Sequence, residues 1–417
     1  MHNQYKSNIG KALIRGNTSL LAVSLSSLLA VFIFLTLSIE VTFTLKVAGF
    51  DVRPVYFFMG GFIVLNIRYI YYGVGVMLAS LFAFVCVVIS VLQGISPTLS
   101  IAHAMLATFA ISFGLASVGY LYKSENKVLS WWIDLYILSG LLVSVYSIVE
   151  FVIYIMYPPL ATWWIGPIPR VSALTFEPSY LAFFLVPIFF VAFTIRRYQT
   201  AALIFISVLL STSRTGLVGL AGGTGALFLI GGGYFRQLFR ATAKYAAVVS
   251  VILLALPNFQ TVLVQFYKFI LSGFTLSELG SSAQARLLSW YYAAQLFIEN
   301  PFFGVGIMGY GPALHAKGIL TNVPAMELRT TNLYLEILAE LGGLGFIAFI
   351  WWVFAPIVRL WKNRRLPKVA GFLAALGSMI FMFPFIQTWW RPYLWMAWIL
   401  AYALAAHCRF QARNRTP

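Results

Sequence analysis

Charged side chains are scarce in this chain of 417 residues. Asp, Glu, Lys and Arg make up 9% of it, whereas hydrophobic residues make up 61% and the mean hydropathy is +0.88. Soluble proteins carry about 25% charged residues. A soluble protein so poor in charge could not cover its surface with polar groups. The composition therefore excludes ordinary soluble domains and indicates an all-α polytopic membrane protein.

Cysteine and histidine are also few, with two and four residues. Cys86 lies in an apolar run and Cys408 close to the C-terminus, so we expect no structural disulfide between them. The Cys and His residues do not have metal-ligand spacing, and we expect neither a metal nor another cofactor. The chain has no P-loop or Rossmann motif. The energy for a reaction would then come from the substrate itself or from an ion gradient.

Acidic residues are the rarer charge: 11 Asp and Glu stand against 28 Lys and Arg, for a net charge of +17. The basic residues form short clusters between apolar runs, a distribution typical of membrane topology and not of nucleic-acid binding. We therefore expect no nucleic-acid partner. If the N-terminus is cytoplasmic, every predicted cytoplasmic turn is basic, which predicts that both termini are cytoplasmic.

A membrane-spanning helix needs about 20 apolar residues. The apolar runs predict about 12 transmembrane helices, at residues 19–45, 54–67, 70–94, 98–121, 129–156, 179–195, 199–212, 215–233, 244–257, 331–357, 369–389 and 392–407.

These runs divide the chain into three parts. Residues 1–257 hold the first nine helices and a short outer loop at 157–178, and residues 331–417 hold the last three helices with a basic cytoplasmic tail. Between them, residues 258–330 form a large outer loop, and loops of this length are usually functional. Within it we predict a helix from Ser281 to Ile298, which ends at Asn300-Pro301 and lies at the membrane surface.

A carboxylate stands where the span at 179–195 begins. Pro178 suits the first position of a helix, which puts Glu177 at a helix N-terminus, where the dipole favours an ionised carboxylate. Glu177 either caps this helix and pairs with Arg170, or is a functional carboxylate. We expect a functional group that deprotonates an acceptor hydroxyl.

Five arginines recur on the predicted outer side of the membrane: Arg170, Arg214, Arg286, Arg329 and Arg391. Each has a simpler reading as a surface, snorkelling or interface-anchoring side chain. The guanidinium group nevertheless suits phosphate, because it offers paired N–H donors. We predict that these residues surround one outer cavity containing Glu177, suited to a lipid with a phosphate or pyrophosphate head.

Polar residues also enter the span at 331–357. Asn332, Glu336 and Glu340 fall on one helical face, and two carboxylates one turn apart repel each other unless they are protonated or paired with arginine. We predict that Asn332, Tyr334 and Glu336 contact substrate and that Glu340 braces neighbouring helices.

Taken in order, these segments resemble a known family over about residues 165–345. The motifs are Phe-Glu-Pro-Ser at 176–179, Ser-Arg-Thr-Gly at 213–216, Arg-x-x-x-Trp at 286–290, Asn-Pro-Phe-Phe-Gly-Val-Gly at 300–306 and Thr-Asn-Leu-Tyr-Leu-Glu-Ile-Leu-Ala-Glu-Leu-Gly at 331–342. They resemble bacterial O-antigen ligases and Wzy-type polysaccharide polymerases.

The resemblance implies a metal-independent, GT-C-like glycosyltransferase in the bacterial inner membrane, with its active site facing the periplasm. Its substrates would be an undecaprenyl-pyrophosphate-linked oligosaccharide donor and a glycan acceptor, and a flippase and a chain-length regulator are partners to consider. Arg214 and Arg286 resemble the pyrophosphate-binding arginines of the family. Glu177 and Arg286 are the predicted catalytic residues.

One position departs from the ligase pattern. Ligases are expected to carry His directly before the Asn of the last motif, where this chain has Thr331, and His315 does not match the motif. We therefore predict a polymerase that joins lipid-linked repeat units. A ligase that transfers the glycan to lipid A core or a protein is the alternative. A transporter or flippase for a lipid-linked glycan is the third reading, although the chain lacks a convincing internal repeat.

Overall fold

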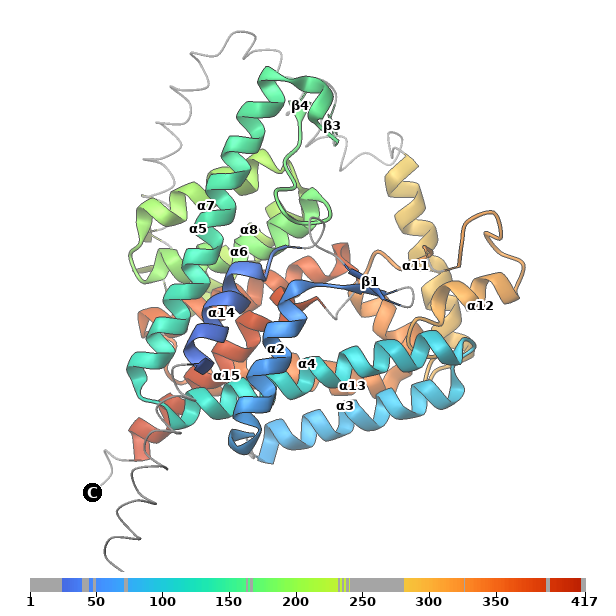
Figure 1. The fold of residues 1–417 in the computed structure, drawn as a ribbon, viewed down its shortest axis with the longest axis horizontal. Helices are drawn as coiled ribbons and strands as arrows, with labels where there is room; N and C mark the ends of the chain where they lie inside the picture. Colours follow the sequence, from blue (N-terminus) through green and yellow to red (C-terminus); the bar gives the residue numbers. More distant parts are fainter. Residues whose placement is uncertain are drawn as a thin grey trace, which may run out of the picture.

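The computed structural model describes residues 25–39, 45–47, 50–70, 74–162, 164–165, 168–231, 233–234, 236–237, 240, 281–325, 327–387 and 391–413. Helices dominate these residues (Figure 1). They are Leu25–Thr36, α2 (Pro54–Asn66), α3 (Val74–Gln93), α4 (Pro97–Lys123), α5 (Asn126–Met156), α6 (Pro178–Thr194), α7 (Tyr198–Leu210), α8 (Arg214–Ile230), α11 (Ser281–Glu299), α12 (Tyr310–Ala316), α13 (Leu333–Trp361), α14 (Pro367–Met382) and α15 (Pro392–Arg413).

Short elements complete the fold. The 3-10 helices are η1 (Ile67–Tyr69), η2 (Pro158–Leu160) and η4 (Phe383–Phe385). Two short antiparallel pairs are also present, β1 (Leu45–Val47) with β2 (Phe50–Val52) and β3 (Trp164–Ile165) with β4 (Ile168–Pro169).

The apolar runs became helices, which confirms a helical membrane protein. Among the described residues, four helices are long and apolar enough to cross a membrane: α4, α5, α13, and α14 together with η4. α7 has 13 residues, and at 1.5 Å per residue it extends about 20 Å, less than the roughly 30 Å of a bilayer core. The count of 12 spans and the GT-C assignment therefore stay predictions, and the run at 244–257 lies outside the described residues.

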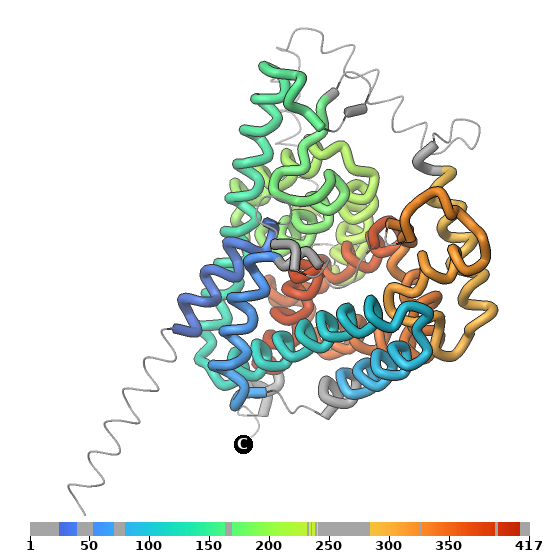
Figure 2. The backbone as a smooth tube through the Cα atoms, turned by 45° about the vertical axis from the view of Figure 1, so that its right-hand side comes forward, coloured from blue at the N-terminus to red at the C-terminus, as the bar shows by residue number. Residues whose placement is uncertain are grey.

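α6 is enclosed by the fold, because every residue from Pro178 to Thr194 is buried. α5, α7, α8 and α14 pack around it. α3 packs against α13 and α4, and α4 packs against α15. In two views α11 and α12 lie on the opposite side of the molecule from Leu25–Thr36 (Figures 1 and 2).

The predicted helix of the large outer loop is α11. It ends at Glu299, directly before the expected stop at Asn300-Pro301. One side of α11 is buried and another is exposed. Ala293 and Leu296 are buried in a small core with residues of α12 and α13, whereas Leu287, Leu288 and Tyr291 are exposed. α11 is thus fastened to the helical body by one face and presents an apolar strip on another.

α13 is interrupted at Gly342, which has a φ of 66° and a ψ of −169°. The segment Pro301–Gly306 runs through this break, and backbone N–H groups donate on both sides of it. The hydrogen bonds are Val305 to Ala339 (2.9 Å), Gly306 to Glu340 (3.0 Å), Gly343 to Pro301 (2.7 Å) and Leu344 to Phe302 (3.3 Å). The motif at 300–306 and the end of the motif at 331–342 therefore form one structural unit. We call this backbone-to-backbone contact the joint.

Candidate functional site

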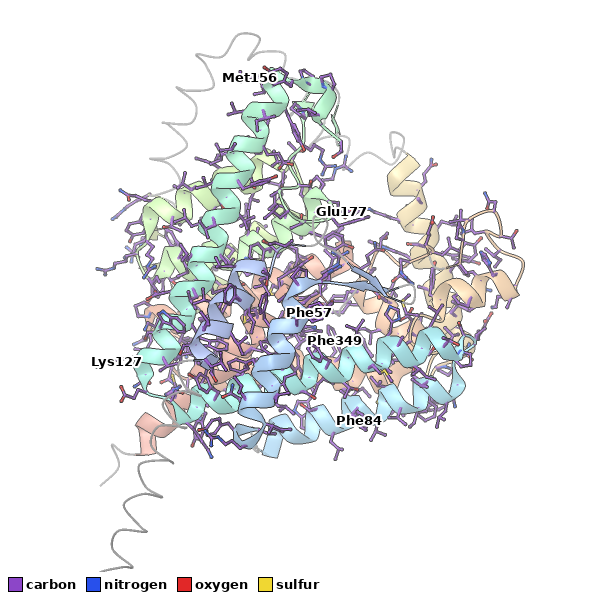
Figure 3. The ribbon with its side chains drawn as sticks, viewed as in Figure 1. Phe57, Phe84, Lys127, Met156, Glu177 and Phe349 are labelled. Carbon is purple, nitrogen blue, oxygen red and sulfur yellow. The ribbon has the colours of Figure 1, made fainter. Side chains whose placement is uncertain are left out.

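A cavity of about 410 Å³ opens between the N-terminus of α6, the helix α11, the segment before α13 and residues 385–387. Figure 3 shows Glu177 between the α6–α8 region and α11. The polar residues that line the cavity are Glu177, Tyr180, Arg286, Ser289, Tyr310, Glu327, Arg329, Thr331 and Gln387. The fold thus brings three of the predicted site residues, Glu177, Arg286 and Arg329, to one space from three separate elements.

Glu177 occupies the N-cap position of α6, with an extended backbone (φ −153°, ψ 163°) and Pro178 after it. Its side chain makes no capping hydrogen bond to the helix. The carboxylate instead accepts a hydrogen bond from the Ser179 hydroxyl and lines the cavity. This geometry favours the functional reading of Glu177 over the capping one.

Arg170 lies behind Glu177. Its Nε donates to the carbonyl of Ser211 at 3.2 Å and to the Thr212 hydroxyl at 3.0 Å, so it ties the loop before α6 to the turn between α7 and α8. Burial lowers the pKa of Arg170, the charge of Glu177 opposes this shift, and the charges of the neighbouring Arg286 and Arg214 add to it. An anion bound here would relieve this repulsion between cations.

Arg214 is the first residue of α8, and it is exposed. The N-cap is Ser213, whose hydroxyl accepts a hydrogen bond from Gly216 N–H at 3.4 Å. Arg214 and Arg286 are close enough to repel each other, although α8 and α11 are far apart in sequence. Arg170, Arg214 and Arg286 therefore form one positive cluster beside Glu177, and Arg286 also lines the cavity.

Arg329 lines the cavity from the segment before α13. Burial lowers its pKa, and the carboxylates of Glu340 and Glu336 oppose that shift. Those two side chains are 2% and 1% exposed. Arg329 thus brings a positive charge near the two acidic residues on one face of α13.

Asn332 and Tyr334 have contacts that stabilise α13. The Asn332 side-chain oxygen accepts hydrogen bonds from Tyr334 N–H (3.0 Å) and Leu335 N–H (3.2 Å), which makes it the N-cap. The Tyr334 hydroxyl donates to the Ile380 carbonyl at 3.0 Å, and its ring packs edge-on against Phe383. Neither is among the described residues that line the cavity, and their predicted substrate contact stays a prediction, as does that of Glu336.

Arg391 does not line the cavity but contacts Tyr180, which does. Its guanidinium carbon is 3.6 Å from the centre of the Tyr180 ring, and both residues are buried. Tyr180 itself lines the cavity. Arg391 therefore adds positive charge behind an aromatic wall, a geometry in which a cation–π contact is strengthened by desolvation.

Thr331 lines the cavity at the position where ligases are expected to carry His. Its hydroxyl accepts a hydrogen bond from the Trp290 indole N–H at 3.0 Å and lies 3.1 Å from the Ser289 hydroxyl. Thr331 therefore joins α13 to α11. His315 is on α12, where a ring nitrogen lies 2.7 Å from the Val323 carbonyl oxygen.

Several lining residues were not predicted from the sequence. Tyr310, whose hydroxyl donates to the Ser289 carbonyl at 3.1 Å, and Glu327 lie in segments without a recognisable motif. Gln387 follows the helix α14. The rarity of acidic residues could have pointed to Glu327, because the chain has only 11 of them.

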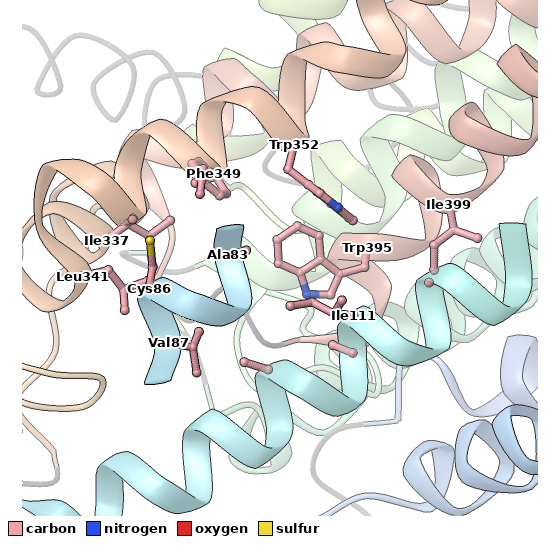
Figure 4. A pocket seen from close by; sticks show the side chains of 15 residues that line it. Ala83, Cys86, Val87, Ile111, Ile337, Leu341, Phe349, Trp352, Trp395 and Ile399 are labelled. Carbon is pink, nitrogen blue, oxygen red and sulfur yellow. The ribbon is translucent and has the colours of Figure 1, made fainter. Parts of the chain in front are cut away.

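A second cavity, of about 60 Å³, lies between α3, α4, α13 and α15 (Figure 4). Cys86, Phe349, Trp352 and Trp395 are among its almost wholly apolar lining residues. It offers no charged side chain, in contrast to the cavity at Glu177. Elsewhere, within the described residues, no three His, Cys, Asp or Glu side chains are grouped so that they could hold a metal ion.

Residues 199–350 match the family model described as O-Antigen ligase, Wzy_C. Over these residues the chain is similar to the O-antigen ligase and Wzy superfamily, whose members are glycosyltransferase-like enzymes of polysaccharide and lipopolysaccharide biosynthesis. The matched region contains Arg214, Arg286, Arg329 and Thr331, whereas Glu177 lies outside it. No curated protein matches the chain.

Proposed function

We propose that the protein is a Wzy-type polysaccharide polymerase. It transfers a glycan from undecaprenyl pyrophosphate to a sugar hydroxyl of a second lipid-linked repeat unit, on the periplasmic face of the bacterial inner membrane. The observation that carries the proposal is that the Glu177 carboxylate and the Arg286 and Arg329 guanidinium groups face one cavity. Its volume of about 410 Å³ is within the usual range for small-molecule sites, about 300–1,000 Å³.

The proposed reaction is a single displacement at the anomeric carbon of the donor sugar. Glu177 accepts the proton of the acceptor hydroxyl, and the hydroxyl oxygen forms the new bond to the anomeric carbon. The bond from that carbon to the diphosphate oxygen breaks, and its electron pair leaves with the lipid diphosphate. The reaction needs no further energy source, because the diphosphate is already a good leaving group.

The arginines serve the leaving group in this scheme. Negative charge grows on the diphosphate as the bond breaks, and guanidinium donors held in place stabilise it without reorganising. Arg286 and Arg329 line the cavity, and Arg170 and Arg214 extend the positive cluster beside Arg286. We propose that these side chains neutralise the diphosphate without a metal ion.

Thr331 favours polymerase over ligase. A threonine hydroxyl held by Trp290 and Ser289 is a poor substitute for an imidazole in proton transfer, whereas Glu177 can accept a proton. A ligase is the second candidate, because the matched family model is described as O-Antigen ligase. The two differ in acceptor: a polymerase uses a second lipid-linked repeat unit, and a ligase uses lipid A core or a protein.

The test is incubation of the purified protein with lipid-pyrophosphate-linked repeat units alone, in the presence of EDTA, followed by sizing of the products. We expect a ladder of longer lipid-linked glycans. Transfer that occurs only after lipid A core is added would make the protein a ligase. Absence of both products would overturn a glycan-transfer function.

A further inference from the structure

Glu150 is a buried carboxylate in the last part of α5, and it is 8% exposed. Its Oε1 accepts a hydrogen bond from the Tyr154 hydroxyl, and its Oε2 accepts one from the Ala173 N–H, both at 2.7 Å. Burial of a carboxylate is costly unless hydrogen bonds compensate it. Tyr154 lies one turn further along the same helix, whereas Ala173 and its neighbour Ser172 contact Glu150 from outside α5.

Ala173 lies at a bend of the loop that leads to α6. Its φ is 51°, in the left-handed region that residues with a Cβ rarely adopt. Such a conformation persists only where the surroundings hold it. The hydrogen bond from the Ala173 N–H to Glu150 is a contact that holds the backbone at this residue.

The bend at Ala173 is connected to Glu177 by a short chain of hydrogen bonds. Thr175 N–H donates to the Ser172 carbonyl at 3.0 Å, and the Thr175 hydroxyl lies 2.7 Å from that carbonyl oxygen and 3.0 Å from the carbonyl oxygen of Glu177. A change in the backbone at Ala173 is therefore transmitted to the backbone that carries the Glu177 carboxylate.

The other side of this loop is fixed separately. Arg170 donates to Ser211 and Thr212 in the turn between α7 and α8. Besides the buried side chain of Val171, side-chain hydrogen bonds attach this loop at two described places: to α7–α8 through Arg170, beside the positive cluster, and to α5 through Glu150. Only the second lies between Arg170 and Glu177 in the chain.

We propose that Glu150 is a positioning residue, which acts through Ala173 to hold Glu177 at the cavity. The proposal rests on the proposed function, because it assigns Glu177 to the reacting acceptor. Glu150 itself does not line the cavity. Loss of its acceptor oxygens should displace the Glu177 carboxylate, and a displacement of about 1 Å can reduce a rate about 100-fold.

The first experiment compares Glu150→Leu with Glu150→Gln, each in the full chain. Leu offers no acceptor to Ala173, whereas Gln keeps one carbonyl oxygen that can accept its N–H. We expect kcat to fall about 10- to 100-fold in Glu150→Leu while the KM for the lipid-linked donor changes less than about threefold. Glu150→Gln should keep most of the activity. Equal losses in both variants, or no loss in a folded Glu150→Leu, would overturn the proposal.

A suppressor variant separates positioning from general damage. Glycine adopts a positive φ without steric cost, so Ala173→Gly should need the Glu150 acceptor less. We expect Ala173→Gly to restore part of the lost kcat when added to Glu150→Leu. A double variant no more active than Glu150→Leu would contradict the proposed route through Ala173.

A third measurement does not depend on activity or on a folded Glu150 variant. Amide hydrogen exchange of the wild-type protein should show the Ala173 N–H protected relative to the neighbouring Leu174 N–H. Rapid exchange at Ala173 would overturn the positioning proposal even if the enzyme polymerises glycans. Conversely, protection at Ala173 in a protein that makes no glycan product would mean that the proposed function fails while the hydrogen bond between Ala173 and Glu150 is present.

Discussion

A side chain at Gly342 would occupy the place of the Phe302 backbone. A Cβ built on Gly342 would lie 2.3 Å from the Phe302 carbonyl carbon, and the φ of Gly342 is 66°. The loop after α11 and the break in α13 are thus packed backbone to backbone. This joint fixes the distance between α11, which carries Arg286, and the start of α13, which follows Arg329 and Thr331.

The joint predicts that Gly342→Ala is strongly destabilising. The left-handed backbone alone costs about 1–3 kcal/mol for a residue with a Cβ, and the clash with Phe302 adds to it. Gly225→Ala is the matched control, because nothing lies within 4 Å of a Cβ at that position in α8. Alanine there should be neutral or stabilising by up to about 1 kcal/mol. Thermal unfolding in detergent should show this order, and equal melting temperatures would contradict the joint.

The hydrogen bonds of Thr331 predict a structural role at the edge of the cavity. Thr331→Val keeps the shape of the side chain but removes the acceptor for the Trp290 indole, so we expect a loss of about 1–3 kcal/mol in stability. Polymerisation by the folded variant should stay within about tenfold of wild type, because proton transfer is assigned to Glu177. A loss similar to that expected for removing a general base, about 100-fold or more, would transfer that role to Thr331.

The position of Arg286 predicts an effect on the leaving group. Removing one stabilising donor at a site of growing charge costs about 100- to 1,000-fold in kcat. We expect such a loss for Arg286→Ala and a smaller one for Arg286→Lys, which keeps the charge but not the paired donors. Lys362→Ala removes a positive charge from the exposed C-cap of α13 and should not change kcat. The contrary result would be full activity in folded Arg286→Ala.

The helices were largely predictable, because long apolar runs between basic clusters leave the backbone few alternatives to helix. The span predicted at 179–195 is α6, Pro178–Thr194, and the outer helix predicted at 281–298 is α11, Ser281–Glu299. How many of these helices cross the bilayer was less predictable. α5 is long and apolar enough to cross, whereas the 13 residues of α7 are too few to cross alone, although both segments are apolar runs in the sequence.

The site was predictable only in its parts. Glu177 and Arg286 stood out because ionisable residues are expensive near a membrane, but their meeting at one cavity depends on how the packing of several other helices places α6 and α11. The hydrogen-bonding roles of Asn332 and Tyr334 depend on local capping and on Ile380, far along the chain. Glu150 was not singled out, because nothing in its apolar surroundings indicates that Ala173 lies opposite.

Two carboxylates of the same cavity provide the most direct test of the central claim. Glu177 and Glu327 both line it, and Glu327 is the more exposed. Glu177→Gln and Glu327→Gln should be compared in single-turnover release of undecaprenyl pyrophosphate from a bound lipid-linked donor in the presence of a lipid-linked acceptor, with donor affinity measured separately.

The account predicts that Glu177→Gln binds donor as the wild type does and releases lipid diphosphate at least about 100-fold more slowly. Glu327→Gln should release it at close to the wild-type rate. Rapid release by folded Glu177→Gln, or a larger loss in Glu327→Gln, would contradict the assignment of Glu177 as the base.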